Sequence, residues 1–484
     1  HVRGPDGYDV MGVGLAGTPI PTLGFNKDVA WTHTVTAARH FAVYALTLAE
    51  GDPTSYIVDG EPVKMTSREV SVPMPGGAAP FTRTFYSTQF GPIVTVPGTP
   101  FGWNDKTAYA LRDANAGNAR AIEAWMGIGR ATDVMEIESA ISETLGIPWV
   151  NTIASDRYGN AFHGDITAVP NVTKALIEEC STPFSGLVAA QVTLLDGSRA
   201  QCDTLTRETS APFAGLLPAD QQASRTLTMY VTNSNDSYWI NNASPSTWYE
   251  ELSPILGPYK NQLSLRTRSN FKETEAMLAA GKMDHERAKE LTFGNKSLAA
   301  ELMVDPLVEH CRAAYSYAEA CEIIARWDRR FDTGSKGALV FVNFWEAVRK
   351  RKDLWEVPFD AENPLITPYG LTADEEVRTE LLDALQEAAE AAADRMGEAE
   401  IAWGDVQVRY GGNERIAIHG GPGTAGVLNM QRSREIPGGL TPVHGSSYIQ
   451  IVGFGDDGPV ADAILSYSQS TNPASPHYAD QTLK

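Results

Sequence analysis

The chain has 484 residues, of which 43% are hydrophobic and 20% are charged. This is the composition of a globular protein that can bury a sizeable core, in one large domain or several small ones. The formal net charge of -21, from 39 basic and 60 acidic residues, argues against a nucleic-acid-binding protein, which needs clustered Lys and Arg. No apolar run reaches the roughly 18 residues of a membrane-spanning helix, so no membrane span is expected.

Residues 1–110 are predicted to form strands and hairpins. The segment 29–35 ("VAWTHTV") alternates weakly, and 41–48 ("FAVYALTL") has the continuous apolar character of a buried strand. Asp59-Gly60 predicts a two-residue hairpin turn, because residues in such a turn need positive φ. The segment "RTFYSTQFGPIVTV" adds another pair of short strands.

Helices are expected next. Residues 117–145 carry apolar side chains at spacings of three and four, which is typical of amphipathic helices. Residues 148–166 predict a hairpin that turns around 156–160, and residues 170–225 are expected to be irregular. Strand formers at 228–232 run into a cluster of Asn, Ser and Asp, where either a turn or a working amide side chain would explain the polar residues.

The second half of the chain is predicted to be mainly helical first and strand-rich at its end. Helices are expected at 270–330, 338–352 and the Glu/Ala-rich 373–398, and strands at 401–410, 414–420 and 446–468. Strand formers at both ends of the chain therefore bracket a helical middle. This pattern indicates an α+β protein in which strands distant in the chain share sheets.

The four cysteines form two pairs that are close in sequence, Cys180 with Cys202 and Cys311 with Cys321. Two small disulfide loops in an oxidising compartment would explain this spacing, and so would four buried thiols in a cytosolic protein. Zinc binding is not favoured, because neither pair has the spacing of zinc ligands and no His is suitably placed near them.

Short motifs do not identify a function. The segment 421–426 ("GPGTAG") matches a dinucleotide-binding pattern, but Pro422 lies inside it and the strand-then-helix context is missing, so a Gly-rich connection is the better interpretation. His33 lies inside a predicted strand, where a satisfied core histidine is the ordinary expectation. His444 lies close to Ser446, but nearness in sequence does not make a catalytic triad.

Longer segments, in order from residue 8 to residue 482, do carry a signal. They are "YDVMGVGLAGTPIPTLGFNKDVAWTHTV", "YALRDANAGNARAIEAWM", "GIPWVNTIASDRYGNA", "VTNSNDSYW", "SLRTR", "VHGSSYIQ" and "SYSQSTNPASPHYADQT". Together they resemble the β-subunit of the penicillin amidase family, and within it the branch of aculeacin A acylase and the acyl-homoserine lactone acylases. The resemblance covers essentially the whole chain and is far more specific than any short motif.

The resemblance implies a fold. This fold is α+β, the N-terminal nucleophile hydrolase sandwich, with four layers in the order αββα and a helical middle region. Residues 1–484 would form one piece of an acylase β-subunit. In it the strand-rich segments 1–110 and 400–484 would make the sandwich core, and 270–400 would make the helical middle.

The resemblance also implies a reaction without a cofactor, the hydrolysis of the amide bond between a fatty or aromatic acyl group and an amine. The precursor of such an enzyme cleaves itself, and the new N-terminal Ser of the β-subunit becomes the nucleophile. Its own α-amine serves as the base, because that group titrates at about 8 and lies within reach of the hydroxyl. A separate His or Asp base is then not needed.

The chain departs from the family pattern at its ends. Family β-subunits open with Ser-Asn, whereas this chain opens at His1, which matches a point further along and has no hydroxyl group. We therefore expect an internal piece of a longer precursor. The α-subunit, which is the expected heterodimer partner, and the nucleophile would lie outside it, so residues 1–484 alone are expected to be inactive.

Within this chain the resemblance places the electrostatic part of the site. A backbone N–H donor matches Val35 and a side-chain amide donor matches Asn235. Both would stabilise the negative charge that develops on the carbonyl oxygen, where one donor contributes about 10²–10³ in rate. From the residues alone, Asn235 is equally a turn former, with Asn233 as an equal candidate. An Arg of the site matches Arg266, with Arg268 as the alternative.

An acyl pocket must be apolar, because each buried methylene group contributes about 0.8 kcal/mol. The residues that match the family's substrate pocket are Leu15, Leu23, His33, Trp125, Trp149 and Val150. An ordinary core position is the alternative for each of them. The segment after Val35 ("TAARHF") has no carboxylate, unlike the calcium site of some penicillin G acylases, so no bound metal is expected.

The cysteine pairs also match this branch, which implies the disulfides Cys180–Cys202 and Cys311–Cys321 and a periplasmic or secreted location. The implied function is the deacylation of small acylated amines such as acyl-homoserine lactones or lipopeptides. The alternatives are a penicillin V or G acylase and a non-catalytic relative that binds acyl groups but lacks the nucleophile.

Overall fold

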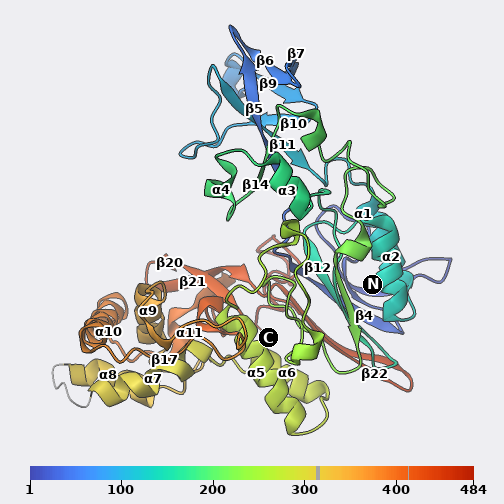
Figure 1. The fold of residues 1–484 in the computed structure, drawn as a ribbon. Coiled ribbons are helices and arrows are strands. Elements are labelled where there is room, and N and C mark those ends of the chain that lie inside the picture. The colour runs from blue at the N-terminus through green and yellow to red at the C-terminus, as the bar shows by residue number, and fades with distance from the viewer. Residues whose placement is uncertain (312–316, 412–413, 484) are drawn as a thin grey trace. The chain divides into compact units, whose positions relative to one another are not determined.

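The computed structural model describes residues 1–311, 317–411 and 414–483. The chain divides into two compact units, unit 1 (His1–Tyr259) and unit 2 (Lys260–Lys484), and Figure 1 labels many of their elements. Each unit contains both helices and strands. The mixed helix and strand content predicted from the sequence is therefore confirmed.

The first sheet of unit 1 is seven-stranded, and its neighbouring strands are antiparallel. From edge to edge its strands are β1 (Val2–Arg3), β2 (Asp9–Val13), β3 (Leu23–Phe25), β4 (Val29–Val35), β12 (Val150–Asp156), β13 (Ala161–Asp165) and β15 (Ala223–Leu227). β4 pairs with β12 over its whole length. The strand predicted at 29–35 and the hairpin at 148–166 are confirmed, and both lie inside the sheet.

Two helices pack on this sheet, α1 (Arg120–Arg130) and α2 (Val134–Thr144). The core that they share with the strands contains large buried side chains, among them Trp31, Trp125, Ile128, Ile137, Ile141 and Phe162. α2 begins after Asp133, whose side chain accepts a hydrogen bond from Glu136 N. Both helices lie within 117–145, where the apolar spacing predicts them.

The second sheet of unit 1 is eight-stranded. Its strands in order are β7 (Glu61–Lys64), β6 (Asp52–Val58), β5 (Phe41–Ala49), β11 (Thr107–Asp113), β10 (Gly91–Val94), β9 (Phe81–Thr88) and β8 (Thr66–Val72), and β14 (Thr193–Asp196) pairs in parallel with β5. Asp59 and Gly60 join β6 to β7 with φ of 51° and 88°. The predicted hairpin turn is therefore confirmed.

The segment 170–225 is not irregular as predicted. It contains α3 (Lys174–Cys180), α4 (Ser185–Val188), β14 and the start of β15. α3 begins after Thr173, whose side chain accepts from Leu176 N, a cap that stabilises a helix too short to show apolar periodicity.

The strand expected at 228–232 lies five residues earlier in the chain, as β15. The reason is the length of its partner, because β13 begins at Ala161, which lies opposite Leu227. Residues beyond Leu227 therefore have no partner in β13, and strand propensity alone does not form a strand there.

Both predicted disulfides are present. Cys180–Cys202 ties the end of α3 to a short 3₁₀ turn, and Cys311–Cys321 ties α7 (Leu298–Cys311) to α8 (Ala318–Arg326). They cross-link residues that are 22 and 10 positions apart, and each such closure contributes about 2–4 kcal/mol of stability.

Unit 2 is rich in helices. They are α5 (Leu265–Ala279), α6 (His285–Phe293), α7 (Leu298–Cys311), α8 (Ala318–Arg326), α9 (Ala338–Val348), α10 (Glu375–Met396) and α11 (Trp403–Val406). The apolar faces of α7, α8, α9 and α10 form its core. α10 begins after Asp374, which caps two backbone N–H groups, and ends at Gly397 with φ of 86°. The helix predicted at 373–398 is confirmed.

Hairpins complete unit 2. They are β16 (Trp355–Val357) with β17 (Tyr369–Leu371), β18 (Val408–Gly411) with β19 (Glu414–Ala417), β20 (Gln431–Ile436) with β21 (Gly439–Gly445), and β22 (Tyr448–Gly455) with β23 (Gly458–Leu465). The segment 401–410 is a strand only in its second half, because Trp403 is buried in helix α11 and its Nε1 donates to Gly420 O. Within the described ranges each sheet takes its strands from one unit, and the four-layer order stays a prediction.

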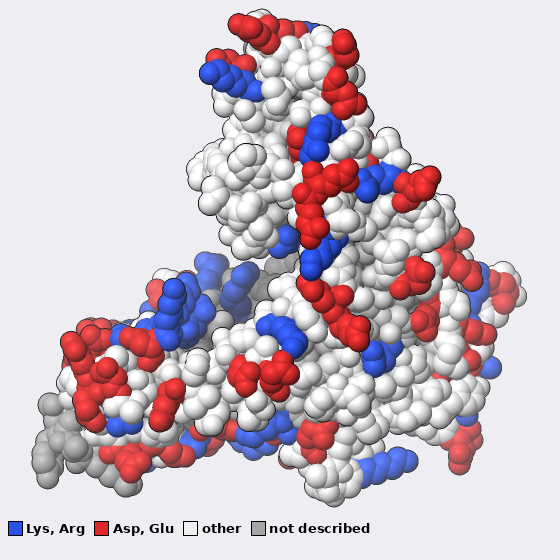
Figure 2. Space-filling model, in the orientation of Figure 1, with Lys and Arg blue, Asp and Glu red and all other residues white. Residues whose placement is uncertain are grey.

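The surface carries mixed charges. On the face shown in Figure 2, acidic and basic side chains are interspersed over both units. Among the residues that the structure describes, no helix is both long and apolar enough to cross a membrane. In the same residues, no group of three or more His, Cys, Asp or Glu side chains is placed to hold a metal ion.

Candidate active site

The end of strand β4 directs a backbone amide away from its neighbour β12. Thr36 N donates to Trp149 O at 3.2 Å, and Val35 lies opposite Val150 in the same register. Hydrogen-bonded and non-hydrogen-bonded residue pairs alternate along an antiparallel ladder. Val35 therefore belongs to a non-hydrogen-bonded pair, and its N–H and C=O point toward the side of β3, beyond the last β3–β4 pair at Trp31.

Asn235 reaches the same strand end from the loop after β15. Its Nδ2 donates to Val35 O at 3.1 Å, and its backbone has a φ of 72°, in the left-handed region that Asn tolerates better than most residues. The C=O and N–H of Val35 point to the same side, so the Asn235 amide group lies on the side of the Val35 N–H. Two N–H donors in such a place can stabilise an oxygen atom that carries negative charge.

Asn233 has a different place in this loop. Its Oδ1 accepts from Thr34 Oγ1 at 2.7 Å and from Asn235 N at 2.8 Å, and its Nδ2 donates to Asp236 O at 3.2 Å. These bonds hold the loop in its turn and attach it to β4. Asn233 is therefore the turn former, whereas Asn235 is exposed and carries its amide to the strand end. The structure separates two residues that the sequence leaves equal.

His33 and Trp125 form a pair between β4 and α1. Trp125 Nε1 donates to His33 Nε2 at 3.0 Å, and His33 Nδ1 lies 3.1 Å from Asn151 O. Because an indole N–H only donates, Nε2 is the acceptor and Nδ1 carries the hydrogen that Asn151 O accepts. Burial lowers the pKa of His33 to about 4, so the ring is neutral near pH 7. Both nitrogens are engaged, and a role in substrate binding stays a prediction.

The other predicted pocket residues of unit 1 differ in exposure. Leu15, in the loop after β2, is 59% exposed, whereas Trp125 is 5% exposed and belongs to the core under α1. Leu23 on β3 and Val150 on β12 are partly buried. Trp125 is thus mainly a core residue, and the contribution of all four side chains to a pocket stays a prediction.

Trp149 stands out among the predicted pocket residues. Its ring is 53% exposed and lies 6.0 Å from the ring of His40, centre to centre. Its backbone has a φ of 64°, which is rare for a bulky side chain. Val35, the last residue of β4, is also exposed, to 64%. Exposed apolar side chains at this strand end suit a surface that an apolar ligand or another chain covers.

Arg266 and Arg268 differ in their surroundings within unit 2. Arg268 is 3% exposed and donates to three carbonyl oxygens of the loop 365–368 at 2.6–3.1 Å. Burial lowers its pKa to about 10, which leaves it charged at neutral pH. Arg268 therefore holds a loop, which leaves Arg266 at the start of α5 as the candidate for the site. Arg266 belongs to unit 2, so its role beside Asn235 stays a prediction.

The Gly-rich segment 421–426 is a packing element of unit 2. A Cβ added to Gly421 would lie 2.5 Å from the ring of Phe331. Gly426, with a φ of 84°, ends the 3₁₀ turn Gly423–Ala425. Close packing and a left-handed turn explain these glycines without a nucleotide, and the prediction of a Gly-rich connection is confirmed.

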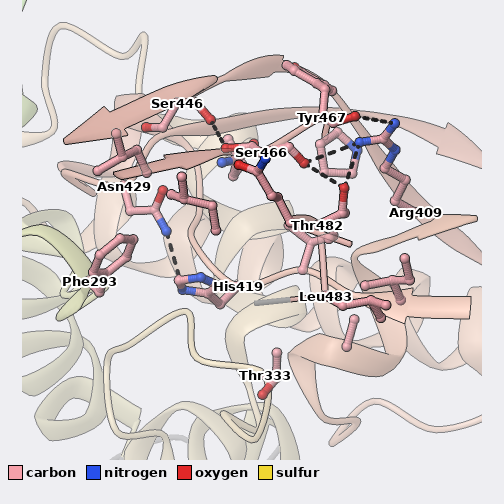
Figure 3. A pocket seen from close by; sticks show the side chains of 18 of the residues that line it. Phe293, Thr333, Arg409, His419, Asn429, Ser446, Ser466, Tyr467, Thr482 and Leu483 are labelled. Atoms are coloured by element: carbon pink, nitrogen blue, oxygen red, sulfur yellow. Dashed lines mark hydrogen bonds between the residues drawn. The ribbon is translucent and has the colours of Figure 1, made fainter. Parts of the chain in front are cut away.

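A cavity of about 510 Å³ also lies in unit 2 (Figure 3). Its lining combines apolar side chains such as Phe293 and Leu483 with polar ones. Asn429 Nδ2 lies 3.3 Å from His419 Nδ1, and Arg409 donates to backbone and hydroxyl oxygens on the other side. None of the residues predicted for the site lines this cavity.

Two buried polar residues beside the strand end were not predicted from the sequence. Asn151 on β12 is 1% exposed, and its Nδ2 lies 3.3 Å from Thr34 Oγ1. Asp165 at the end of β13 is fully buried and accepts from Thr36 Oγ1 at 2.8 Å. The one sequence signal is alternation, because His163 and Asp165 in "AFHGD" occupy every second position of a buried strand.

Comparison with solved structures defines the class of the fold. The thermostable penicillin G acylase from Alcaligenes faecalis matches with a TM-score of 0.58, over 99% of this chain and 87% of that chain, at 16% sequence identity. The chain thus has the fold of a penicillin G acylase.

The family follows from the sequence as a whole. The family model for penicillin amidase matches residues 1–484, and the chain belongs to the penicillin amidase family. Aculeacin-A acylase from Actinoplanes utahensis is 40% identical over 503 residues, and acyl-homoserine lactone acylase PvdQ from Pseudomonas fluorescens is 36% identical over 492 residues. Both comparisons cover 100% of this chain and 62% of the relative, so the chain spans about 62% of their length. The resemblance drawn from the sequence is confirmed.

Proposed function

We propose that this chain is part of the β-subunit of an acylase that hydrolyses the amide bond of small acylated amines, with acyl-homoserine lactones and lipopeptides as the substrate classes. Membership of the family and the names of its relatives support this proposal. The observation that carries it is the approach of Asn235 Nδ2 to Val35 O at 3.1 Å, on the side of β4 to which the Val35 N–H also points. These are the two donors that the family resemblance implies.

In the proposed reaction an N-terminal serine, supplied from outside residues 1–484, attacks the carbonyl carbon of the substrate while its α-amine takes the hydroxyl proton. The carbonyl oxygen becomes an oxyanion, which accepts hydrogen bonds from Val35 N and Asn235 Nδ2. The amine leaves with a proton, and a water molecule then hydrolyses the acyl-enzyme to release the acid. The bond between Asn235 Nδ2 and Val35 O fixes the plane of the amide group before substrate binds.

The proposal also includes an acyl pocket, a partner chain and a cellular location. Leu15, Leu23, Trp149 and Val150 would bind the acyl chain, and Arg266 would complete the site. The α-subunit of the same precursor would be the partner chain, and the strand-rich segments 1–110 and 400–484 would form the core of the αββα sandwich. The two disulfides support a periplasmic or secreted location, because such bonds persist in oxidising compartments.

The test is the substitution Asn235→Ala in the complete enzyme. The loss of one oxyanion donor should lower kcat about 10²–10³-fold while KM changes little. Asn104→Ala is the matched control, because Asn104 is an exposed turn asparagine before β11 and should keep the parent kcat. Rates are taken per mature enzyme, with the fraction of processed chain measured on a denaturing gel.

The substrate class is tested with a panel of acyl-homoserine lactones, a lipopeptide and penicillins V and G on the unaltered enzyme. Hydrolysis of the first two classes with higher kcat/KM supports the proposal, and a preference for penicillins reassigns the enzyme within its family. If the complete enzyme cleaves none of these amides, the proposal is wrong. An Asn235→Ala enzyme with the parent kcat removes Asn235 from the mechanism.

A further inference from the structure

The segment that follows β4 is held in place at its first residue. Thr36 N donates to Trp149 O at 3.2 Å, and Thr36 Oγ1 accepts from Ala38 N at 3.0 Å. The same hydroxyl group donates to Asp165 Oδ2 at 2.8 Å. Three residues after Thr36, Arg39 N donates to Ile255 O at 2.7 Å. Thr36 shares a peptide bond with the carbonyl group of Val35, so whatever fixes Thr36 also fixes the direction of the Val35 C=O, which accepts from Asn235 Nδ2 at 3.1 Å.

Asp165 is the unusual partner in this set, because its carboxyl group is fully buried. Its Oδ2 accepts the Thr36 hydroxyl, and no other described residue hydrogen-bonds to its Oδ1. Burial raises the pKa of Asp165 to about 7, and the Thr36 hydroxyl offsets this rise only in part. A buried carboxyl group is costly to keep without a cation. A neutral side chain would fill a purely structural position at a lower cost in stability than this carboxyl group.

The strand register places Asp165 in one row with other polar residues of the site. Thr152 lies opposite Gly164, and Asn151 lies opposite Thr34. Continuing this register by one residue puts Asp165 beside Asn151 and Thr34 on the same face of the sheet. This face is opposite to the one that packs under α1 and α2. The row ends at the loop of Asn235, since Thr34 Oγ1 donates to Asn233 Oδ1 at 2.7 Å.

We propose that Asp165 is a positioning residue for the oxyanion site, because it holds Thr36 and thereby the Val35 C=O, to which the Asn235 amide donor is bonded. It acts through Thr36 and touches no substrate. This inference rests on the proposed function, because it assigns a supporting role within the same reaction.

A consequence for the reaction follows from the charge of Asp165. Other titratable and charged groups near it are Tyr238 and Tyr249, with Arg225 over the ring of Tyr249 at 4.6 Å and His163 next to Tyr249. Burial raises the pKa of both tyrosines and lowers the pKa of His163 to about 4. Between about pH 6 and about pH 8, Asp165 is thus the group in this set that changes its charge.

An ionised Asp165 opposes the transition state. Its negative charge lies close to donors that must stabilise a second negative charge, and the interior screens this repulsion weakly. The neutral carboxyl group and an amide group both accept the Thr36 hydroxyl, but only the amide group stays neutral at high pH. Asp165→Asn therefore separates the positioning role from the effect of charge.

The experiment compares Asp165→Ala, Asp165→Asn, Thr36→Val, Thr36→Ser and the double variant Asp165→Ala/Thr36→Val in the complete enzyme. Asp165→Ala and Thr36→Val should each lower kcat about 10- to 100-fold with KM within about threefold, since a small misplacement of a donor is costly. Asp165→Asn and Thr36→Ser should keep kcat within about threefold at pH 6, because both keep the hydrogen bond. The double variant should be no worse than Asp165→Ala alone, because both changes break one link.

Two further measurements complete the design. The ratio of kcat between Asp165→Asn and the parent should rise about threefold or more from pH 6 to pH 8.5, because the parent alone acquires the opposing charge. Asp203→Asn is the matched control for loss of a buried carboxyl group, since Asp203 is 2% exposed and pairs with Arg112 at 3.0 Å elsewhere in unit 1. It should leave kcat unchanged.

The outcomes are distinct. An active parent whose kcat survives Asp165→Ala overturns the inference and leaves the proposed function standing. Effects of Asp165→Ala and Thr36→Val that multiply in the double variant also overturn it, because the two residues would then act independently. If the Asp165 variants do not mature, Thr36→Val alone decides the test. A Thr36→Val enzyme with the parent kcat rejects the inference, and a Thr36→Val enzyme with the predicted loss of kcat supports it. A parent that hydrolyses no acyl amide refutes the proposed function, and this inference falls with it.

Discussion

Asp165→Asn should change how the stability of the protein depends on pH. The folded protein holds the Asp165 proton more tightly than the unfolded chain does, because burial raises the pKa of this carboxyl group from 3.8 to about 7. Between these two values the folded state binds more protons than the unfolded state. The free energy of unfolding of the parent therefore falls as the pH rises from about 4 to about 7. An asparagine cannot ionise, so the variant lacks this fall.

The magnitude follows from the two pKa values. Their difference is 7 minus 3.8, or about 3 units, and each unit corresponds to 1.36 kcal/mol, which gives about 4 kcal/mol. The advantage of Asp165→Asn over the parent should thus grow by about 4 kcal/mol between pH 4 and pH 8. Below pH 4 both proteins carry a neutral group at this position, and the difference should be small and constant.

Urea unfolding followed by tryptophan fluorescence measures this difference at a series of pH values. Thr36→Val is the control, because it removes the hydroxyl partner but keeps the carboxyl group, and should retain the fall with pH. A difference between Asp165→Asn and the parent that stays constant within about 1 kcal/mol from pH 4 to pH 8 would refute the reasoning. The carboxyl group would then have the same proton affinity in the folded and unfolded chains.

Two further substitutions test the site and the fold. Trp149→Ala should lower kcat/KM for a dodecanoyl substrate at least about tenfold more than for a hexanoyl substrate, because a pocket wall contributes about 0.8 kcal/mol per buried methylene; an equal loss for both chain lengths would make Trp149 a packing residue. Arg268→Met should lower the free energy of unfolding by about 3–5 kcal/mol, because three carbonyl oxygens of the loop 365–368 lose a charged donor. Denaturant unfolding of Arg268→Met with the parent midpoint would contradict that reasoning.

The sequence predicts elements whose cause is local. Asp59-Gly60 forms its hairpin because two residues with positive φ suffice to turn the chain, and α10 begins and ends at a capping Asp and a Gly. The short helix α3 lacks enough residues for a periodic pattern, and β15 is placed by the length of its partner β13. The end of β15 depends on where β13 begins, and β13 is a different segment of the chain. The sequence around β15 alone therefore does not fix its bounds.

The same distinction applies to the site. The family resemblance implies Val35 and Asn235 as the two donors. The segment "NSNDS" by itself does not show which Asn holds the turn and which reaches β4. The bond of Asn233 Oδ1 to Thr34 decides this, and it joins residues 199 positions apart. Likewise, the sequence alone does not distinguish Arg266 from Arg268. The structure does, because Arg268 donates to three carbonyl oxygens of the loop 365–368. Asp165 was not predicted as a site residue, because its hydrogen-bond partner, Thr36, is 129 positions away in the sequence.

The left-handed backbone of Trp149 has a consequence for attempts to make the enzyme more robust. A bulky residue at a φ of 64° costs free energy that a glycine would not, so a screen that rewards thermal stability alone would favour Trp149→Gly. The same change would delete the exposed ring near His40, and with it the proposed acyl contact. Selection for stability should therefore favour Gly at position 149, whereas selection for activity on long acyl chains should favour Trp.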